Sequence, residues 1–319
     1  MENKTQNELL EIEAAKLVKK KKKTALLSIF LGVGSILTFL LVWDLLCRFN
    51  LVSDKMLVSP ITVIKEIMVK FTDNRKVKVQ VNNLSKSFGT LEVLKDCNFS
   101  VKDGEFLCVV GPTGCGKTTF LNLLSNLIEP TSGEVLIDGE KASPQKHNLS
   151  FIFQEPSALP WLTVEDNIKY GMKAKIKDQK YIQEQADRII GLMGLEKYRK
   201  SFPGEMSTSA EQRIVIGRAF AVNPDLLLMD EPYGQMDIKT RFYLEDEVIR
   251  IWREFKRTVI FITHNIEEAV YLAERVLVLT NKPAKVKEEI NIDLPRPRDI
   301  ASPEFVEIRN HITELIRWW

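Results

Sequence analysis

Cysteine is scarce in this sequence, and its four copies follow no recognisable spacing. Cys47, Cys97, Cys108 and Cys115 form no C-x-x-C pair, so the common sequence signs of a zinc site or a disulfide framework are missing. An excess of one charge is missing too, since 45 Lys and Arg residues face 43 Asp and Glu residues. The net charge of +2 gives no reason to expect nucleic acid as a partner. The sequence has no internal repeat, and its only low-complexity segment is the run Lys19–Lys23.

The composition is that of an ordinary folded chain. Of 319 residues, 45% are hydrophobic and 28% are charged, which is usual for globular proteins. The length suffices for one large domain with an appendage. Because the hydrophobic pattern changes near Val77, we expect an N-terminal segment over residues 1–76 and a domain over residues 77–319.

The N-terminal segment contains a candidate transmembrane helix. Residues 25–43 (Ala25–Trp43) form about 19 residues without a charge, which reaches the length of a membrane span. A cleaved signal peptide would have a shorter apolar core and a small-residue cleavage site, and a buried core helix is the other alternative. Residues 59–71 predict an amphipathic helix opened by Ser59-Pro60. Lys65 and Glu66 interrupt this stretch, so it predicts no second crossing.

The most informative stretch is GPTGCGKTT, which fits the phosphate-binding template G-x-x-x-x-G-K-S/T. A short apolar run, Phe106–Val110, precedes it, and apolar residues at helical spacing follow over Thr119–Leu127. A strand, a glycine loop and a helix form an anion cradle in which backbone N–H groups face a phosphate. A chance glycine turn ending in Lys-Thr is the alternative. The predicted nucleotide-binding residues of this stretch are Gly111, Pro112, Thr113, Gly114, Cys115, Gly116, Lys117, Thr118 and Thr119.

The sequence predicts a separate role for each of three side chains of this loop. Lys117 would reach the β- and γ-phosphates of a nucleotide, and the Thr118 hydroxyl would bind Mg²⁺. Cys115 lies inside the loop, where a small filler residue is favoured over a reactive thiol.

The sequence does not settle on which side of the membrane the phosphate-binding loop lies, if the nucleotide is ATP. The lysine run places the N-terminus in the cytoplasm by the positive-inside rule, and a single crossing would put the loop outside, away from ATP.

Short strands surround the loop in the sequence. Val77, Val79 and Val81 alternate with polar residues, as in a half-exposed strand, and Val93–Val101 and Val135–Asp138 are further short strands. Together they predict a small antiparallel layer.

Four more apolar runs alternate with helical patterns and predict a parallel sheet covered on both faces. These runs are Leu149–Phe153, Leu226–Met229, Thr258–Thr263 and Arg275–Thr280. The predicted fold class is therefore α/β, with the parallel sheet of a P-loop NTPase beside an antiparallel β layer. Phe88 lies some twenty residues before the loop, where it could stack on an adenine, and a partly buried Phe is the alternative.

Polar side chains close three of the apolar runs. Asp230 ends LLLMD and could hold Mg²⁺, and the adjacent Glu231 could activate a water for attack on a γ-phosphate. Gln154 ends LSFIF and could touch both the metal and the water. His264 ends TVIFIT and could bind the γ-phosphate and hold the water in line. Ligands of parallel sheets sit at the carboxyl ends of strands, so we expect these residues to converge, although an acidic turn and a structural His remain the alternatives. The predicted catalytic residues are Glu231, His264 and Gln154, and the predicted metal ligands are Thr118, Gln154 and Asp230.

From about Val77 onward the chain resembles an ABC-transporter ATP-binding subunit. The resemblance rests on GPTGCGKTT, FIFQEP, LLLMDEP, GQMD with Asp237, and the His of THNIEEA. ALPWLTVEDNI, from Ala158 to Ile168, and LPRPRDI, from Leu294 to Ile300, are similar to the ATPases of the nitrate, sulfonate and taurine importers. Residues 20–72 resemble the start of the permease of that importer family, without its further spans, which suggests a fusion or deletion product.

The resemblance implies a function and a set of partners. It implies an α-helical subdomain at about residues 155–220, a C-terminal tail at about residues 293–319, and ATP and Mg²⁺ as ligands. It implies import of a small anion through permease transmembrane subunits that contact the loop Glu155–Asn167. A second ATPase subunit, identical or different, and indirectly a substrate-binding protein are the other expected partners. The implied location is the cell membrane, with the ATPase domain on the cytoplasmic side.

One motif departs from the family pattern. The signature L-S-G-G-Q corresponds to Met206–Ala210, where Ser207 is kept and Thr208 and Ser209 replace both glycines. In the family this segment contacts the ATP held by the partner subunit, so Ser207 is an expected nucleotide contact across a dimer. Asp237 of the GQMD motif is a further expected nucleotide-binding residue. Glycine permits close backbone approach to a phosphate. The two side chains are therefore expected to impair the site that they complete.

Two other functional classes remain as alternatives. One is a membrane-tethered nucleotide-binding interaction protein, such as a decayed permease–ATPase fusion with little ATP turnover. The altered signature favours it, and the intact Glu231 and His264 argue against it. The other is a soluble ABC protein of translation or DNA repair. Such proteins carry paired ATPase domains or long coiled coils, and this sequence shows neither.

Overall fold

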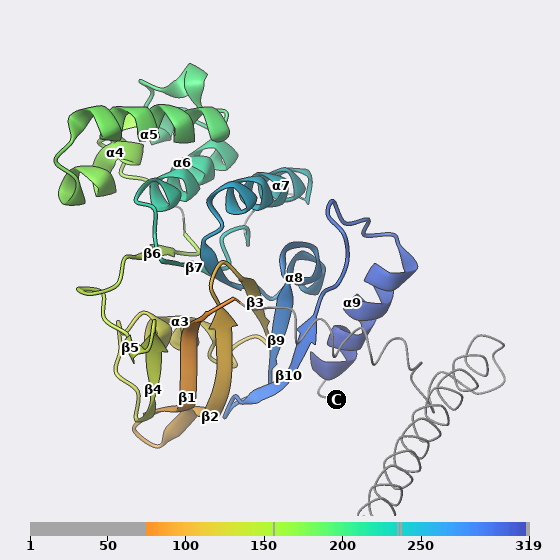
Figure 1. Cartoon of the computed structure of the whole chain (residues 1–319). Helices are drawn as coiled ribbons and strands as arrows, with labels where there is room; N and C mark the ends of the chain where they lie inside the picture. The colour runs from red at the N-terminus through yellow and green to blue at the C-terminus, as the bar shows by residue number, and fades with distance from the viewer. Residues whose placement is uncertain (1–74, 156, 235, 237, 317–319) are drawn as a thin grey trace, which may run out of the picture. The chain divides into compact units, whose positions relative to one another are not determined.

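Two β-sheets and a group of helices make up the part of the chain that the structure describes (Figure 1). The structure is a computed structural model, and it describes residues 75–155, 157–234, 236 and 238–316. The predicted span at residues 25–43 and the amphipathic helix at residues 59–71 lie outside these residues and stay predictions. Within the described ranges, no helix is both long enough and apolar enough to cross a membrane.

The larger sheet has six strands, and five of them run parallel in the order β9-β3-β8-β7-β6. The predicted parallel sheet is thus confirmed. A sixth strand, β10, pairs antiparallel with β9 at the edge and makes the sheet mixed, which the sequence analysis did not predict. The strands are β3 (Phe106–Val110), β6 (Leu149–Ile152), β7 (Leu226–Asp230), β8 (Thr258–Ile262), β9 (Arg275–Leu279) and β10 (Val286–Asn291).

Successive residues of these strands enter different hydrophobic cores. In β3, Phe106 and Cys108 belong to the core under the helices, whereas Leu107 and Val109 belong to the core under the antiparallel sheet. Side chains of a strand point alternately to opposite faces, and both faces here are covered. The uninterrupted apolar runs of the sequence follow from this double burial.

The smaller sheet is antiparallel, in the order β2-β1-β4-β5, and confirms the predicted layer. In β1, Val79 and Val81 are buried whereas Val77 is exposed, so the alternation predicts the buried face correctly except at the strand end. The helix α3 (Lys117–Leu124) packs into the same core through Phe120 and Leu121. The strands are β1 (Val77–Phe88), β2 (Leu91–Lys102), β4 (Ser132–Ile137) and β5 (Glu140–Lys141).

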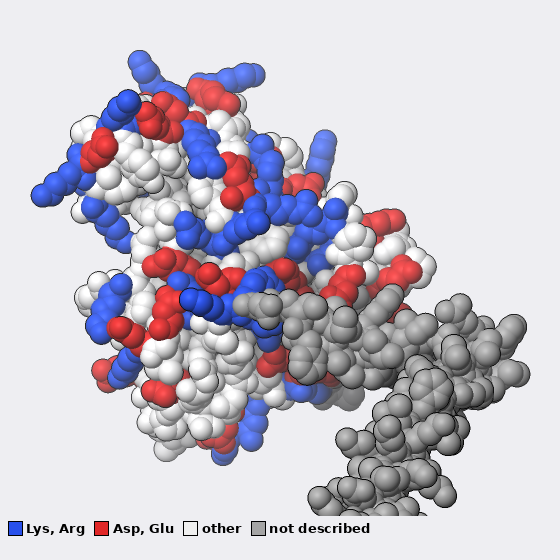
Figure 2. Space-filling view, viewed as in Figure 1, with Lys and Arg blue, Asp and Glu red and all other residues white. Residues whose placement is uncertain are grey.

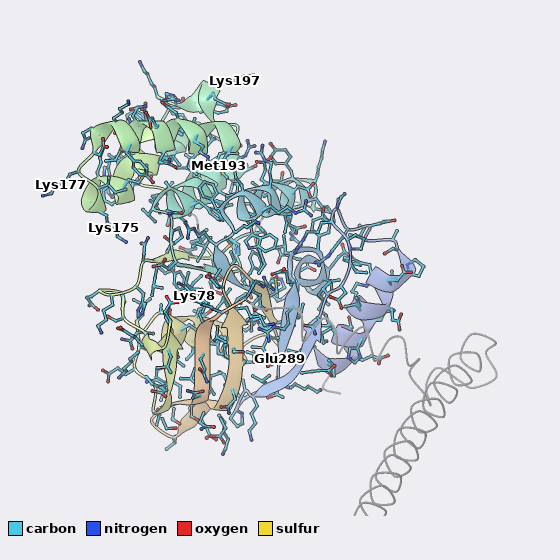
Figure 3. All side chains as sticks on the ribbon, viewed as in Figure 1. Lys78, Lys175, Lys177, Met193, Lys197 and Glu289 are labelled. Atoms are coloured by element: carbon cyan, nitrogen blue, oxygen red, sulfur yellow. The ribbon has the colours of Figure 1, made fainter. Side chains whose placement is uncertain are left out.

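The remaining helices form two groups. In Figure 1, α4 and α5 stand apart from both sheets, and α7, α8 and α9 lie along the larger sheet. Helix α6 lies between α4 and β6, where the Ser150 hydroxyl donates to the Ala219 carbonyl. In the first group Met193 is buried, while Lys175, Lys177 and Lys197 project outward (Figure 3). Its N-caps Thr163, Asp178 and Ser207 each accept a backbone hydrogen bond. The bounds are α4 (Val164–Lys175), α5 (Gln179–Leu192), η1 (Glu196–Tyr198), η2 (Pro203–Glu205), α6 (Thr208–Ala221), α7 (Ile238–Phe255), α8 (Ile266–Leu272) and α9 (Pro303–Ile316).

Candidate active site

The phosphate-binding loop connects β3 to α3, as the sequence predicts. Gly116 precedes the helix with a φ of 115°, a conformation that other residues rarely adopt. A Cβ at this position would lie 2.6 Å from Cγ1 of Val93. Glycine is therefore required here by both the backbone and the space around it.

The sulfur of Cys115 points into the protein. The residue is only 1% exposed, and burial raises the pKa of its thiol above the ordinary value. A protonated, buried thiol is a poor nucleophile, so the environment favours the filler role over a reactive one.

Lys117 links the loop to the acidic end of β7. Its ammonium donates to the carbonyl oxygens of Gly111 at 3.2 Å and Pro112 at 3.4 Å. The same Nζ lies 3.7 Å from Oε1 of Glu231. Since Lys117 is 7% exposed, its charge is held in a site with little water.

Two of the three predicted metal ligands, Thr118 and Asp230, contact each other. The Thr118 side chain hydrogen-bonds to the carboxylate of Asp230, which is 6% exposed. Burial raises the pKa of Asp230 above the ordinary range, and the Thr118 hydrogen bond opposes that rise. A buried carboxylate beside a hydroxyl is a donor set that suits a hard cation.

Glu231 sits at the centre of the predicted residues. Its Oε2 is 2.7 Å from Nδ1 of His264, and its other carboxylate oxygen faces Lys117. The backbone of Glu231 has a positive φ of 42°, and its N–H donates to the Ile262 carbonyl at 2.9 Å. A non-glycine residue in this region is strained and is often found at active sites. This strain had no sign in the sequence.

The sheet order explains why these side chains meet. Strands β3, β8, β7 and β6 are adjacent and parallel, so the loop, His264, the acidic pair and Gln154 all follow carboxyl ends at one edge. Gln154 is exposed. Its side-chain amide lies close to Gly234, since a Cβ added to that glycine would be 3.7 Å from the Gln154 Nε2 atom.

Two other predicted residues, Phe88 and Ser207, lie outside this group of contacts. Phe88 ends β1 with a half-exposed ring, and the Lys86 ammonium lies 4.9 Å from the ring centre. Ser207 is exposed at the N-terminus of α6, where its hydroxyl accepts a hydrogen bond from the Ala210 N–H at 3.3 Å. Asp237 lies outside the described residues.

A buried polar group beneath the site was not predicted. Glu245 of α7 is 1% exposed and Glu268 of α8 is 5% exposed. Glu268 hydrogen-bonds Thr263, next to His264, and Arg241 lies close enough to influence the pKa of both acids. The signal was present in the sequence, because Glu245 stands in the apolar stripe of α7 that contains Leu244 and Val248.

We expect these two acids to make stability fall as pH rises. Burial and the charge of Glu268 together raise the pKa of Glu245 to about 8, and burial raises the pKa of Glu268 to about 7. The folded chain therefore holds protons that the unfolded chain releases near pH 4.5, and the free energy of unfolding decreases from there to about pH 8. Glu245→Gln should raise the melting temperature at pH 8 by about 3 °C or more and flatten its pH dependence.

Thermal melts followed by circular dichroism at pH 6, 7 and 8 would measure this. The exposed Glu184→Gln on α5 is the matched control and should change neither the melting temperature nor its slope. A Glu245→Gln variant that melts with the wild-type pH dependence would contradict the assignment of the buried proton.

The fold and the contacts define a class of protein. A phosphate-binding loop after a strand of a largely parallel sheet, with an acidic pair and a histidine at neighbouring strand ends, is the architecture of a P-loop ATPase. The family model described as "ABC transporter" matches residues 94–234. The chain is also 40% identical over 257 residues to an uncharacterized ABC transporter ATP-binding protein of Methanocaldococcus jannaschii, covering 79% of this chain and 96% of that protein. The chain therefore belongs to the ATP-binding proteins of the ABC transporter family, and it is an ABC-type ATPase.

Further comparisons agree with this family. The chain is 39% identical over 240 residues to the aliphatic sulfonates import ATP-binding protein SsuB of Bacillus cereus, covering 74% of this chain and 94% of that protein. A solved dimer of the bacterial ABC transporter cassette MJ0796 is 28% identical, with a TM-score of 0.60 over 68% of this chain and all of that one. A second dimer of that cassette, bound to ADP and Pi in a post-hydrolysis state, is 29% identical with a TM-score of 0.59 over the same shares. None of these matches supports the predicted permease resemblance of residues 20–72, which lie outside the described residues.

Proposed function

We propose that this chain hydrolyses ATP to drive import of a small anion, such as a sulfonate, through a membrane permease. The observation that carries the proposal is the chain of contacts from Lys117 through Glu231 to His264 at one sheet edge. The import direction and the anion class are supported by the 39% identity to the sulfonate import protein SsuB. A position at the membrane with the ATPase domain on the cytoplasmic side follows from the same proposal.

The nucleotide would lie over the loop and α3. Backbone N–H groups of residues 113–116 and the N-terminus of α3 would face the phosphates. Lys117 would donate to phosphate oxygens in place of the loop carbonyls of Gly111 and Pro112. Phe88, half exposed at the end of β1, stacks on the adenine. Ser207 acts across a dimer, on the nucleotide of the partner subunit, and Asp237 is a further proposed nucleotide contact.

Mg²⁺ is the proposed metal, held by Thr118, Asp230 and Gln154. Hydroxyl, carboxylate and amide oxygens are the hard donors that this ion prefers, and the burial of Asp230 leaves a negative charge for a cation to compensate. When bound, Mg²⁺ supplies charge compensation for the phosphate oxygens.

The protein's own groups then carry the hydrolysis. Glu231 accepts a proton from the attacking water, whose oxygen forms a bond to the γ-phosphorus while the bond to the β–γ bridging oxygen breaks, giving ADP and phosphate. His264 orients Glu231 by donating from Nδ1 at 2.7 Å. With a second proton on Nε2, the ring also donates to the γ-phosphate. Lys117 stabilises the negative charge on the transferred group.

The permease would dock on the loop before α4. The buried Asn167 side chain bonds the backbone of this loop at three carbonyls, of Leu159, Leu162 and Thr163, and at the Leu159 N–H. Arg218 holds the Ser157 carbonyl at 2.8 Å. These bonds hold the loop rigid from behind, while Trp161 is 69% exposed. A fixed loop that presents an exposed aromatic ring suits a protein contact.

Replacing Trp161 by Ala should separate the chain from its permease. We expect the amount of permease that co-purifies with the chain to fall roughly tenfold, because a buried Trp anchor is often an interface hot spot. Binding of ATP should be unchanged, since Trp161 touches no proposed nucleotide contact. The control is Tyr181→Ala, which removes a different exposed aromatic side chain, located on α5. Equal co-purification of Trp161→Ala and wild type would exclude this loop as the docking site.

A further inference from the structure

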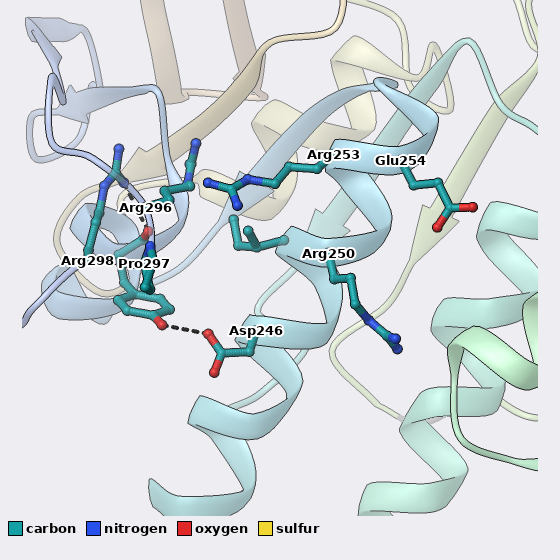
Figure 4. A pocket seen from close by; sticks show the side chains of 9 residues that line it. Asp246, Arg250, Arg253, Glu254, Arg296, Pro297 and Arg298 are labelled. Carbon is teal, nitrogen blue, oxygen red and sulfur yellow. Dashed lines mark hydrogen bonds between the residues drawn. The ribbon is translucent and has the colours of Figure 1, made fainter.

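A second cavity lies between α7 and the C-terminal tail (Figure 4). Its volume is about 440 Å³, and it is lined from α7 by Ile249 and Arg253, from α8 by Tyr271, and from the tail by Arg296 and Pro297. None of the residues around it belongs to the predicted nucleotide site. A separate ligand can therefore be considered for it.

The acids that line this cavity are engaged elsewhere. Asp246 accepts a hydrogen bond from the Tyr271 hydroxyl at 2.5 Å. Glu254 is paired with Arg188 of α5. Neither carboxylate is bonded to an arginine of the tail, so the positive charges there are not neutralised by direct ion pairs with them.

One terminal nitrogen of Arg296 makes no hydrogen bond within the described residues. Its guanidinium lies 4.9 Å from the Trp252 ring centre, and the other terminal nitrogen donates to the Leu272 carbonyl. The Nε atom is buried, so it does not face the cavity, and it has no hydrogen-bond partner among the described residues. The neighbouring Arg298, 6% exposed, is held by main-chain carbonyls, including those of Val270 and Ile292. Arg298 therefore holds the tail in place, whereas Arg296 has guanidinium N–H groups without a hydrogen-bond partner in the described part of the chain.

Arg253 faces Arg296 from the other side. Figure 4 shows its guanidinium reaching toward that of Arg296, and within the described part of the chain it has no hydrogen bond or ion pair. Burial lowers the pKa of Arg296, and the charge of Arg253 lowers it further, while Glu274 opposes both. Glu274 is itself bonded to Arg75 at 2.8 Å. Two guanidinium groups therefore face one space without a carboxylate bonded to either.

We propose that Arg253 and Arg296 form a binding site for a small oxoanion, namely a sulfate, sulfonate or phosphate group. Planar guanidinium groups bind such anions with paired, charge-assisted hydrogen bonds. The volume is within the range of small-molecule pockets, and Ile249 and Pro297 leave an apolar side for a short organic substituent. Lys and Arg side chains gather beside α7 in Figure 2, which favours the approach of an anion.

A bound anion would join three elements of the fold. It would bridge α7 to the tail, and Arg296 bonds the carbonyl of Leu272, the last residue of α8. Helix α8 begins directly after Asn265, next to His264. The site is therefore distinct from the phosphate loop but is connected through α8 to the strand end that carries the histidine.

Calorimetric titration of the full-length chain with sodium sulfate, at constant ionic strength, tests the proposal. We expect saturable binding that weakens at least about tenfold in Arg253→Gln, because a charge-assisted pair is lost. Arg253 is exposed, so this variant should fold. Arg250→Gln is the matched control, since Arg250 lines the same cavity but is paired with Glu247 at 2.5 Å and points away from Arg253 (Figure 4). Its affinity should equal that of the wild type.

Two further experiments identify the site that binds the anion and the kind of anion that it prefers. Lys117→Ala should retain sulfate binding, since the phosphate loop is a different anion site. Titrations with methanesulfonate and with inorganic phosphate distinguish a sulfonate from a phosphate source, and a preference for either supports the oxoanion site. Absence of binding in the wild type, wild-type affinity in Arg253→Gln, or loss of binding in Lys117→Ala alone would overturn the proposal.

Discussion

Replacing Glu231 by Gln should reduce ATP turnover by at least about a hundredfold while ATP binding is retained. A general base contributes roughly 10²- to 10⁴-fold to a hydrolysis rate, and the amide cannot accept the proton of the attacking water. Gln keeps the shape of the side chain, so the 2.7 Å contact to His264 can persist as a hydrogen bond and the side chain can stay near the Lys117 ammonium, 3.7 Å away in the wild type. We therefore expect the variant to accumulate in the ATP-bound form.

Phosphate release and equilibrium binding of ATP, measured on the same preparation, would check this result. Glu267→Gln is a suitable control, because Glu267 is the second residue of α8, close to His264 in sequence, but is paired with Arg309 at 3.6 Å. It should keep wild-type turnover. Turnover of Glu231→Gln within a few-fold of the wild type would exclude Glu231 as the base and would remove the main support for the proposed mechanism.

Restoring glycine at the signature segment should increase turnover by the homodimer. Thr208 and Ser209 are the first two residues of α6, after the N-cap Ser207. In the proposed dimer this helix terminus faces the γ-phosphate bound by the partner subunit, and two extra side chains keep the backbone from approaching it. We expect the double variant Thr208→Gly/Ser209→Gly to hydrolyse ATP about tenfold faster, equivalent to about 1.4 kcal/mol in the barrier.

The control must separate this effect from the loss of helix stability. Glycine in place of another residue costs up to about 1 kcal/mol within a helix. Gln179→Gly/Lys180→Gly changes the same two positions of α5, which the N-cap Asp178 precedes in the same way. This variant should lose stability without gaining turnover.

The same measurement distinguishes the functional alternatives. If the signature variant and the wild type are equally slow, and mixing with a subunit that carries an unaltered signature does not help, the nucleotide-binding interaction protein becomes the better description. If mixing restores turnover, the chain acts as one half of a heterodimer.

Much of the site could be predicted because its constraints are local. The spacing from Gly111 to Thr118 is dictated by the turn that wraps a phosphate, and Gly116 occupies a backbone conformation and a space that exclude a side chain. The uninterrupted apolar runs indicate strands buried on both faces. Such runs are directly followed by Asp230, Glu231 and His264, so the position of these residues at strand ends could be predicted from the sequence alone.

Other features depend on contacts between distant segments. No local pattern distinguishes β6, β7 and β8, which are all short and apolar, so their order in the sheet had to come from the structure. That order puts β8 between β3 and β7 and brings His264 beside Glu231. The exposed edge strand β10, with alternating polar residues, was missed for the opposite reason, because it lacks the apolar run that marked the others.

The phosphate-binding loop and the acids and histidine proposed for hydrolysis could be predicted from the sequence, because short-range geometry sets their spacing. The contacts among them, the burial of Glu245 and Glu268, and the approach of Arg253 to Arg296 could not be predicted in this way. Burial, pKa and charge pairing depend on the surroundings of a side chain, and those surroundings are built from segments far apart in the sequence.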